Sequence, residues 1–361
     1  EAEDWSYGDL KSAILGTAHG FLELGLKPGQ KLILRLGNTV DFPIAYLAAI
    51  AVGIYPIPVS SQLTMSELQK LCTDLSPSAV CIDPDFGFPE SDTMIQILLS
   101  DLRKMRSLAP VKFELGPPDR LAYLVLTSGT SGTPKIVMHA HRTIWARRMM
   151  FRDWYDLRQD DRVFHAGAFN WTYTLGTGLL DPWSFGATAL VLAGEASLDK
   201  IPALLAKHEA SIFAASPGVY RKLLRSPDFP ETPRLRHGLS AGEKLSESLR
   251  ELWLEKTSTK IYEAFGMSEC STFVSSSPKS EARVSTIGRP QNGRRVAILP
   301  LSGSDKPVNF GETGIIAVDL KDPGLMLGYV GSASSKDNNF SRKWFITGDL
   351  GQMASDGSIT Y

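Results

Sequence analysis

The sequence predicts an α/β protein whose mostly parallel sheets are covered by helices, with a β-rich C-terminal part. Apolar runs of strand length alternate with segments of helical periodicity over most of the chain, which is typical of parallel sheets. At 361 residues the chain is longer than one hydrophobic core usually serves, so at least two packed units are expected. After about residue 285 short β runs are separated by Gly, Pro, Asn and Asp, which indicates a small antiparallel sheet or barrel.

The N-terminal part predicts three helices that alternate with three strands. Its helices have apolar residues at helical spacing, and Gly25 and Gly53 stand near the ends of the first two. The predicted helices are 7–26, 39–53 and 64–75, and the predicted strands are 30–36, 55–60 and 78–83. Residues 83–120 are richer in Pro, Asp and Gly and are expected to be a connection.

The alternation resumes at Leu121 and gives way to the β-rich part. The expected elements are strands 121–126, 186–193 and 210–216, helices 141–155, 198–209 and 218–226, and β runs 294–300, 311–320 and 343–351. We therefore divide the chain into a first α/β subdomain at 1–115, a second at 116–285 and a β-rich subdomain at 286–361.

Composition excludes several classes of protein. Net charge is −1, so no global basic field favours nucleic acid or an anionic membrane. The longest apolar stretch is interrupted by Pro56 and Pro58, so no membrane span is predicted. The cysteines and most histidines match no metal-site spacing, and reduced thiols in a cytoplasmic protein are the simplest interpretation. These residues are Cys72, Cys81, Cys270, His139, His141, His165, His208 and His237.

The stretch "LTSGTSGTPK" is the clearest candidate site. It follows a buried-type strand and is expected to lead into a helix at 139–150, a position where backbone N–H groups and a helix N-terminus attract anions. Hydroxyls at Thr127, Ser128, Thr130, Ser131 and Thr133 can donate to phosphate, Gly129 and Gly132 permit close approach, and Lys135 adds a positive charge. A flexible linker would need none of these flanks. The stretch also fails the Walker A pattern, because Ile136 follows Lys135 where that pattern has Ser or Thr.

Four segments in order resemble the adenylate-forming superfamily of acyl- and aryl-CoA ligases, luciferases and carrier-protein-loading adenylation domains. They are the loop at 127–135, "LSAGEKL" at 239–245, "YEAFGMSE" at 262–269 and "WFITGDLG" at 344–351. The resemblance implies two helix-flanked, mostly parallel sheets in an αβαβα arrangement plus a small antiparallel β-barrel. It also implies a hinge and a C-terminal lid domain beyond Tyr361 that this chain lacks, so we expect a fragment that binds its substrates but adenylates poorly.

The resemblance also implies a reaction and its residues. ATP, Mg²⁺ and CoA are the expected cofactors, and a carboxylic acid attacks the α-phosphate to give an acyl-adenylate. Thr130, Lys135, Ser268 and Glu269 are the candidate catalytic residues, and Glu269 is the candidate Mg²⁺ ligand. The nucleotide is expected to contact Thr127, Ser128, Gly129, Thr130, Ser131, Gly132, Thr133, Lys135, Gly242, Glu243, Glu263, Ala264, Phe265, Gly266 and Asp349.

The acid and the thiol are less well defined. The segment "HAGAFNWTYTLGTGLL" is similar to the family's acyl pocket, and Trp171 stands where many members have His. A bulky indole there favours a small aromatic or a short- or medium-chain acid, although Trp171 would equally suit a core position. The other candidate pocket residues are Ser216, Tyr220, Gly242 and Met267. Amino-acid-activating members normally place an Asp in this region, and the nearest polar residue here, Asn170, is uncharged, which disfavours an α-amino acid.

Three functions remain open from the sequence. The first is an acyl- or aryl-CoA ligase, the second an adenylation domain that loads a carrier protein, and the third a non-catalytic nucleotide or acyl binder. The presence of Lys135, Glu269 and Asp349 argues against the third. Expected partners are the acid, ATP, CoA, the missing C-terminal domain and a second copy in a homodimer.

Overall fold

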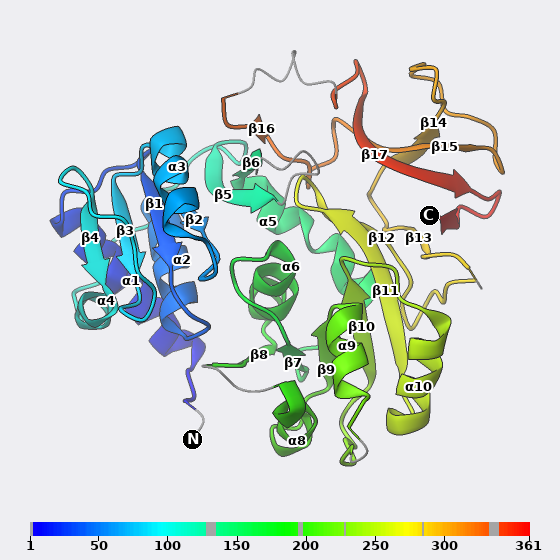
Figure 1. Ribbon diagram of the computed structural model, residues 1–361, viewed down its shortest axis with the longest axis horizontal. Helices are drawn as coiled ribbons and strands as arrows, with labels where there is room; N and C mark the ends of the chain where they lie inside the picture. The colour runs from blue at the N-terminus through cyan, green and yellow to red at the C-terminus, as the bar shows by residue number, and fades with distance from the viewer. Residues whose placement is uncertain (1–2, 128–134, 194–197, 227–228, 284, 332–338) are drawn as a thin grey trace. The chain divides into compact units, whose positions relative to one another are not determined.

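The computed structural model describes residues 3–127, 135–193, 198–226, 229–283, 285–331 and 339–361 (Figure 1). The chain forms two compact units, each continuous except for one short excursion. The first comprises 1–141 with 168–171, and the second comprises 142–167 with 172–361. The α/β architecture predicted from the sequence is confirmed in both units.

The first unit contains a four-stranded parallel sheet in the order β2-β1-β3-β4. Helices α1 and α3 begin where the sequence supplies N-caps, at Ser6 and at the Thr64–Glu67 capping box. The elements are α1 Tyr7–Glu23, β1 Lys31–Arg35, α2 Asp41–Ala51, β2 Tyr55–Pro58, α3 Met65–Leu75, β3 Ala79–Ile82, β4 Ile95–Leu98, α4 Leu99–Met105, β5 Leu121–Thr127 and β6 Lys135–Ala140. Residues 83–120 were expected to be a connection, but they include β4 and α4.

The second unit is built on a seven-stranded sheet in the order β13-β12-β11-β10-β9-β7-β8, parallel from β11 to β8. Strands β12 and β13 add antiparallel to its β11 edge. The elements up to β13 are α5 His141–Ala146, η1 Phe151–Tyr155, β7 Arg162–His165, α6 Thr172–Leu175, η2 Gly176–Leu180, α7 Asp181–Phe185, β8 Thr188–Val191, η3 Leu198–Lys200, α8 Ile201–Lys207, β9 Ile212–Ala215, α9 Pro217–Leu223, β10 His237–Ala241, α10 Glu247–Thr257, β11 Lys260–Met267, β12 Ser271–Ser275 and β13 Arg289–Pro290.

Both faces of this sheet are covered: every residue of β9 is buried, and successive side chains of a strand point to opposite faces. On β9, Phe213 packs with Tyr220 and Trp253 from α9 and α10, in a core cluster on one face. Its neighbour Ile212 belongs to the cluster of Trp154 from η1 on the other face. The carboxyl ends of β10 and β11 are thereby fixed, and these ends carry two of the predicted motifs.

A four-stranded antiparallel sheet in the order β14-β15-β17-β18 completes the second unit. Its elements, with β16, are β14 Val296–Leu299, β15 Thr313–Asp319, β16 Gly328–Tyr329, β17 Trp344–Met353 and β18 Ile359–Thr360. Ile359 pairs with Gly288, which ties the end of this sheet to the segment before β13. Of the helices that the structure describes, none combines the length and apolar character that a membrane span requires.

Candidate active site

The phosphate-loop motif lies between two paired strands rather than between a strand and a helix. β5 and β6 are antiparallel, with Thr127 opposite Lys135, and the Thr127 hydroxyl donates to the Lys135 carbonyl at 3.3 Å. The expected helix at 139–150 was therefore placed too early, because "KIVMHA" pairs as β6 and α5 begins at His141. A helix N-terminus directly after the loop consequently cannot be the source of positive potential there.

Most of the predicted loop residues fall outside the part of the chain that the structure describes: Ser128, Gly129, Thr130, Ser131, Gly132 and Thr133. The two residues that flank them are described. Thr127 is half-buried at the end of β5, and Lys135 is exposed at the start of β6. The hairpin thus brings a lysine to the base of the loop.

Glu269 lies on a turn between β11 and β12 in the second unit. Its side chain is 8 % exposed, and the Tyr329 hydroxyl donates to Glu269 Oε1 at 2.8 Å. The Glu269 carbonyl accepts a hydrogen bond from Met326 N at 2.7 Å. Ser268 precedes it on the same turn and is half-buried. The turn therefore presents a hydroxyl and a carboxylate side by side, with the carboxylate already oriented.

Two buried ion pairs hold the backbone that follows Glu269. Arg147 forms a bidentate pair with Asp181, at 2.7 and 2.6 Å, and also donates to the Ser271 hydroxyl. Arg294 pairs with Asp322, and its Nη2 donates to the carbonyls of Cys270 and Thr272 at 3.3 and 3.2 Å. Sequence analysis missed these residues, since each pair joins segments far apart in the chain.

The segment after β10 approaches β11 through the Glu263 side chain. Gly242 has φ +95°, which a glycine adopts without strain, and Glu243 after it is exposed. Glu263 Oε1 accepts from Leu245 N at 2.9 Å, and its other oxygen pairs with Arg250. Burial raises the pKa of Glu263, while these donors oppose the increase. The Glu263 carboxylate thus links β11 to the segment after β10 and to α10.

Two aromatic rings meet beyond Glu263. Along β11, Ala264 is buried, whereas Phe265, Gly266 and Met267 are half-buried. The Phe265 ring lies 4.8 Å from the Tyr361 ring, centroid to centroid. Sequence reasoning did not select Tyr361, which stands twelve residues after Asp349. A planar base would suit a site beside such rings.

Asp349 follows Gly348 on β17. Its backbone N–H donates to the Thr347 hydroxyl at 3.1 Å, and that hydroxyl donates to the Ile316 carbonyl at 2.8 Å. Partial burial raises the pKa of Asp349 above its ordinary value. The Asp349 side chain is half-buried, and a carboxylate of this kind is suited to accept hydrogen bonds from neutral hydroxyls.

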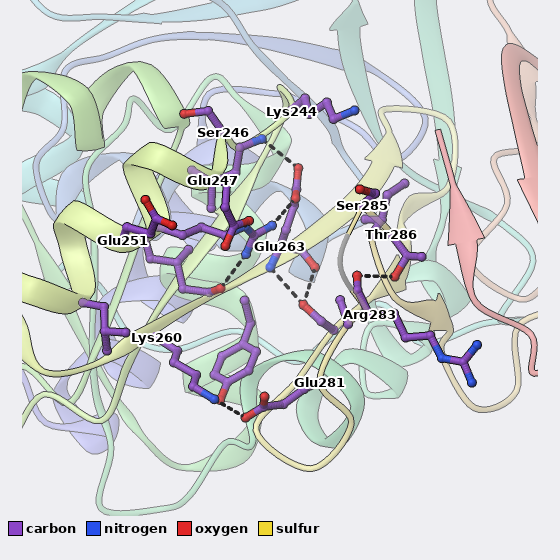
Figure 2. Close-up of a pocket in the computed structure, with 18 of the residues that line it drawn as sticks. Lys244, Ser246, Glu247, Glu251, Lys260, Glu263, Glu281, Arg283, Ser285 and Thr286 are labelled. Atoms are coloured by element: carbon purple, nitrogen blue, oxygen red, sulfur yellow. Dashed lines mark hydrogen bonds and ion pairs between the residues drawn. The ribbon is translucent and has the colours of Figure 1, made fainter.

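A pocket of about 600 Å³ opens between α10, β11 and the chain before β13 (Figure 2). Leu245, Glu263 and Tyr361 are among its lining residues, so it adjoins the β10 and β11 motifs. Figure 2 shows Lys260 and Glu281 pointing toward one another across it, and they form an ion pair at 2.7 Å. This ion pair places two opposite charges on the pocket wall.

The predicted acyl-pocket residues have different environments. Trp171 is 36 % exposed, so the core role considered for it does not hold. Ser216 is half-buried at the N-cap of α9. Tyr220 has no exposed surface, and its hydroxyl donates to the carbonyls of Phe213 and Leu239. Its ring is part of the core cluster under α9, and its role in an acyl pocket stays a prediction.

The carboxylate oxygens of Glu269 are of the kind that Mg²⁺ prefers as ligands. Among the described residues, no cluster of three or more His, Cys, Asp or Glu side chains is arranged to hold a metal ion. Mg²⁺ commonly binds one or two carboxylates and takes its other ligands from water and substrate phosphates. The hydrogen bond from the Tyr329 hydroxyl reaches Oε1 and places no cationic partner on this carboxylate.

This fold and these motifs define an adenylate-forming α/β enzyme domain. The model of a family described as AMP-binding enzyme matches residues 1–330. The chain therefore belongs to the AMP-binding enzyme family.

Individual relatives agree with this assignment. The chain is 28 % identical over 377 residues to a 4-hydroxybenzoate–CoA/benzoate–CoA ligase of Rhodopseudomonas palustris, covering 99 % of this chain and 69 % of that protein. It is similar to the crystal structure of a benzoate CoA ligase from Burkholderia xenovorans LB400, with TM-score 0.88, 24 % identity and coverage of 99 % and 74 %. ATP-bound MatB from Rhodopseudomonas palustris gives TM-score 0.89 at 23 % identity, covering 99 % and 73 %.

Proposed function

We propose that this protein activates a carboxylic acid with ATP, forms an acyl-adenylate and transfers the acyl group to CoA. The observation that carries the proposal is the buried Glu269 carboxylate, oriented by Tyr329 on the Ser268–Glu269 turn. Acid activation requires an anionic carboxylate to approach an anionic triphosphate, so charge must be offset at that point. The family match, together with the resemblance of residues 262–269 to a motif of the superfamily, supports this turn as the place that would hold the metal.

Each candidate residue has a distinct task in this proposal. Lys135 and the hydroxyls of the loop bind the β- and γ-phosphates. Glu269 would hold Mg²⁺, which would supply positive charge next to the phosphates. Ser268 donates a hydrogen bond to the α-phosphate or to the acid. Phe265 and Tyr361 flank the adenine, and Asp349 accepts hydrogen bonds from the ribose hydroxyls.

The proposed acid is small and aromatic, or of short to medium chain length. The relative from Rhodopseudomonas palustris is described as acting on 4-hydroxybenzoate and benzoate, and the solved structure from Burkholderia as a benzoate CoA ligase. Trp171 stands in the segment expected to form the acyl pocket, and its indole would limit the room for a long chain. CoA is the proposed thiol because these relatives are CoA ligases.

ATP–pyrophosphate exchange across benzoate, the hydroxybenzoates and aliphatic acids tests the activation step. Addition of CoA, or of a carrier protein, then identifies the thiol acceptor by mass spectrometry of the thioester. Glu269→Gln and Lys135→Ala should each reduce exchange by about 100-fold, as expected for lost electrostatic stabilisation. Glu312→Gln, on an exposed turn residue, is the control. Wild-type exchange rates in both site variants would refute the roles proposed for Glu269 and Lys135. If a thioester forms only with the carrier protein, the thiol acceptor is the carrier protein and not CoA.

A further inference from the structure

The Tyr329–Glu269 hydrogen bond is the contact from which we draw a further inference, which rests on the proposed function. Tyr329 lies on β16 and is 5 % exposed, and Glu269 is 8 % exposed. The donor and acceptor oxygens are 2.8 Å apart, which is ordinary for an O–H···O hydrogen bond. A glutamate side chain has three rotatable bonds, so a fixed donor removes much of its freedom.

The segment that carries Tyr329 is itself attached to the Glu269 turn. Met326 N donates to the Glu269 carbonyl at 2.7 Å, three residues before Tyr329. Further upstream, Asp322 pairs with Arg294, which donates to the Cys270 carbonyl. The tyrosine is therefore held at a set position relative to the carboxylate by backbone and side-chain contacts. This arrangement differs from a long surface side chain that meets a partner only transiently.

The chemistry of the donor matters as much as its position. A lysine or arginine paired with Glu269 would neutralise the carboxylate and compete with a divalent cation for it. A phenol carries no charge at neutral pH, so it orients one oxygen and leaves the negative charge for the metal. Partners of this kind, which contact the ligand rather than the metal, commonly change metal affinity strongly when removed.

We propose that Tyr329 is a positioning residue, which fixes the Glu269 carboxylate in the orientation that binds the magnesium ion of ATP. It acts through Glu269 and makes no contact with substrate in this proposal. Its contribution is therefore to metal affinity and to metal-dependent steps, and not to the binding of metal-free nucleotide.

The test compares Tyr329→Phe with the wild type in the full chain. Mn²⁺ binding in the presence of ATP, followed by electron paramagnetic resonance, reports the metal site without turnover. We expect Tyr329→Phe to weaken Mn²⁺ binding by about 10-fold and to raise the half-saturating Mg²⁺ concentration for exchange similarly. Binding of ATP in EDTA should be unchanged. Ser211→Ala is the matched control, since it also removes a buried hydroxyl from a carboxylate, that of Asp161, at 2.7 Å.

A double-mutant comparison separates positioning from general damage. In a Glu269→Gln background, Tyr329→Phe should cause no further loss of Mn²⁺ binding, because the carboxylate that Tyr329 is proposed to orient is absent. An undiminished effect in that background, or unchanged Mn²⁺ binding in the single variant, would overturn the proposal. If Glu269→Gln itself leaves Mn²⁺ binding and exchange intact, the assignment of Glu269 in the proposed function fails as well.

Discussion

Burial, and not bond length, should decide how much an ion pair contributes to the stability of this protein. Two pairs in the second unit have nearly equal N–O distances, 2.6 Å for Arg147–Asp181 and 2.7 Å for Lys260–Glu281. Their exposure differs, at 8 and 1 % for the first pair and 53 and 56 % for the second. Asp181 also accepts the Tyr155 hydroxyl at 2.6 Å. Asp181→Asn and Glu281→Gln are isosteric changes that each remove one charge.

Asp181→Asn should lower the free energy of unfolding by about 3 to 5 kcal/mol, because it leaves the Arg147 charge buried without a counter-charge. Glu281→Gln should cost less than about 1 kcal/mol, since water screens that pair. Urea denaturation followed by tryptophan fluorescence measures both, with unchanged m-values required for comparison. A double variant, Arg147→Met with Asp181→Leu, should recover much of the loss. Equal costs for Asp181→Asn and Glu281→Gln would refute the reasoning.

Three further predictions, the second with a matched control at Gly8, each concern a single position. Asp349→Asn should raise the KM for ATP roughly 10-fold, since hydrogen bonds to a charged acceptor are among the stronger ones; an unchanged KM in initial-rate kinetics would remove Asp349 from the ribose site. Gly266→Ala should destabilise by about 1 to 3 kcal/mol or more in thermal unfolding, because its Cβ would lie 2.3 Å from the Ser271 carbonyl oxygen. Gly8→Ala, with its nearest neighbour at 3.6 Å in α1, should be neutral or slightly stabilising. Burial lowers the pKa of His165 to about 3, below the ordinary 6.5, so the unfolded state takes up a proton first and stability falls as pH drops from 6.5 toward 3. His165→Asn should reduce that slope by about 1.4 kcal/mol per pH unit in urea titrations, and an unaltered slope would contradict the assignment.

Local sequence signals predicted much of the secondary structure. Alternating apolar runs located α2, β2, α3 and β3, because helix and strand periodicities are local properties. The signals failed where a segment suits either state. His139 and Ala140 were expected to begin a helix but end β6, because β5 offers this segment an antiparallel partner. The stretch 83–120 was expected to be a connection but includes β4, because β3 had an open edge.

The sequence by itself determined the order of the motifs and the residue types that carry charge at the site. The resemblance of these motifs to the adenylate-forming superfamily selected Glu269, Asp349 and Phe265 as candidates, and the family match agrees with that superfamily. Residue type sets the chemistry that a side chain can perform, and residue type is read directly from the sequence.

Only the tertiary structure decided which partners those side chains meet. Tyr329 reaches Glu269 from 60 residues away, and Tyr361 reaches Phe265 from the end of the chain. Glu263 binds Arg250, and Tyr220 is sequestered in the core. Burial and hydrogen-bond partners arise when distant segments pack together, so no local spacing encodes them.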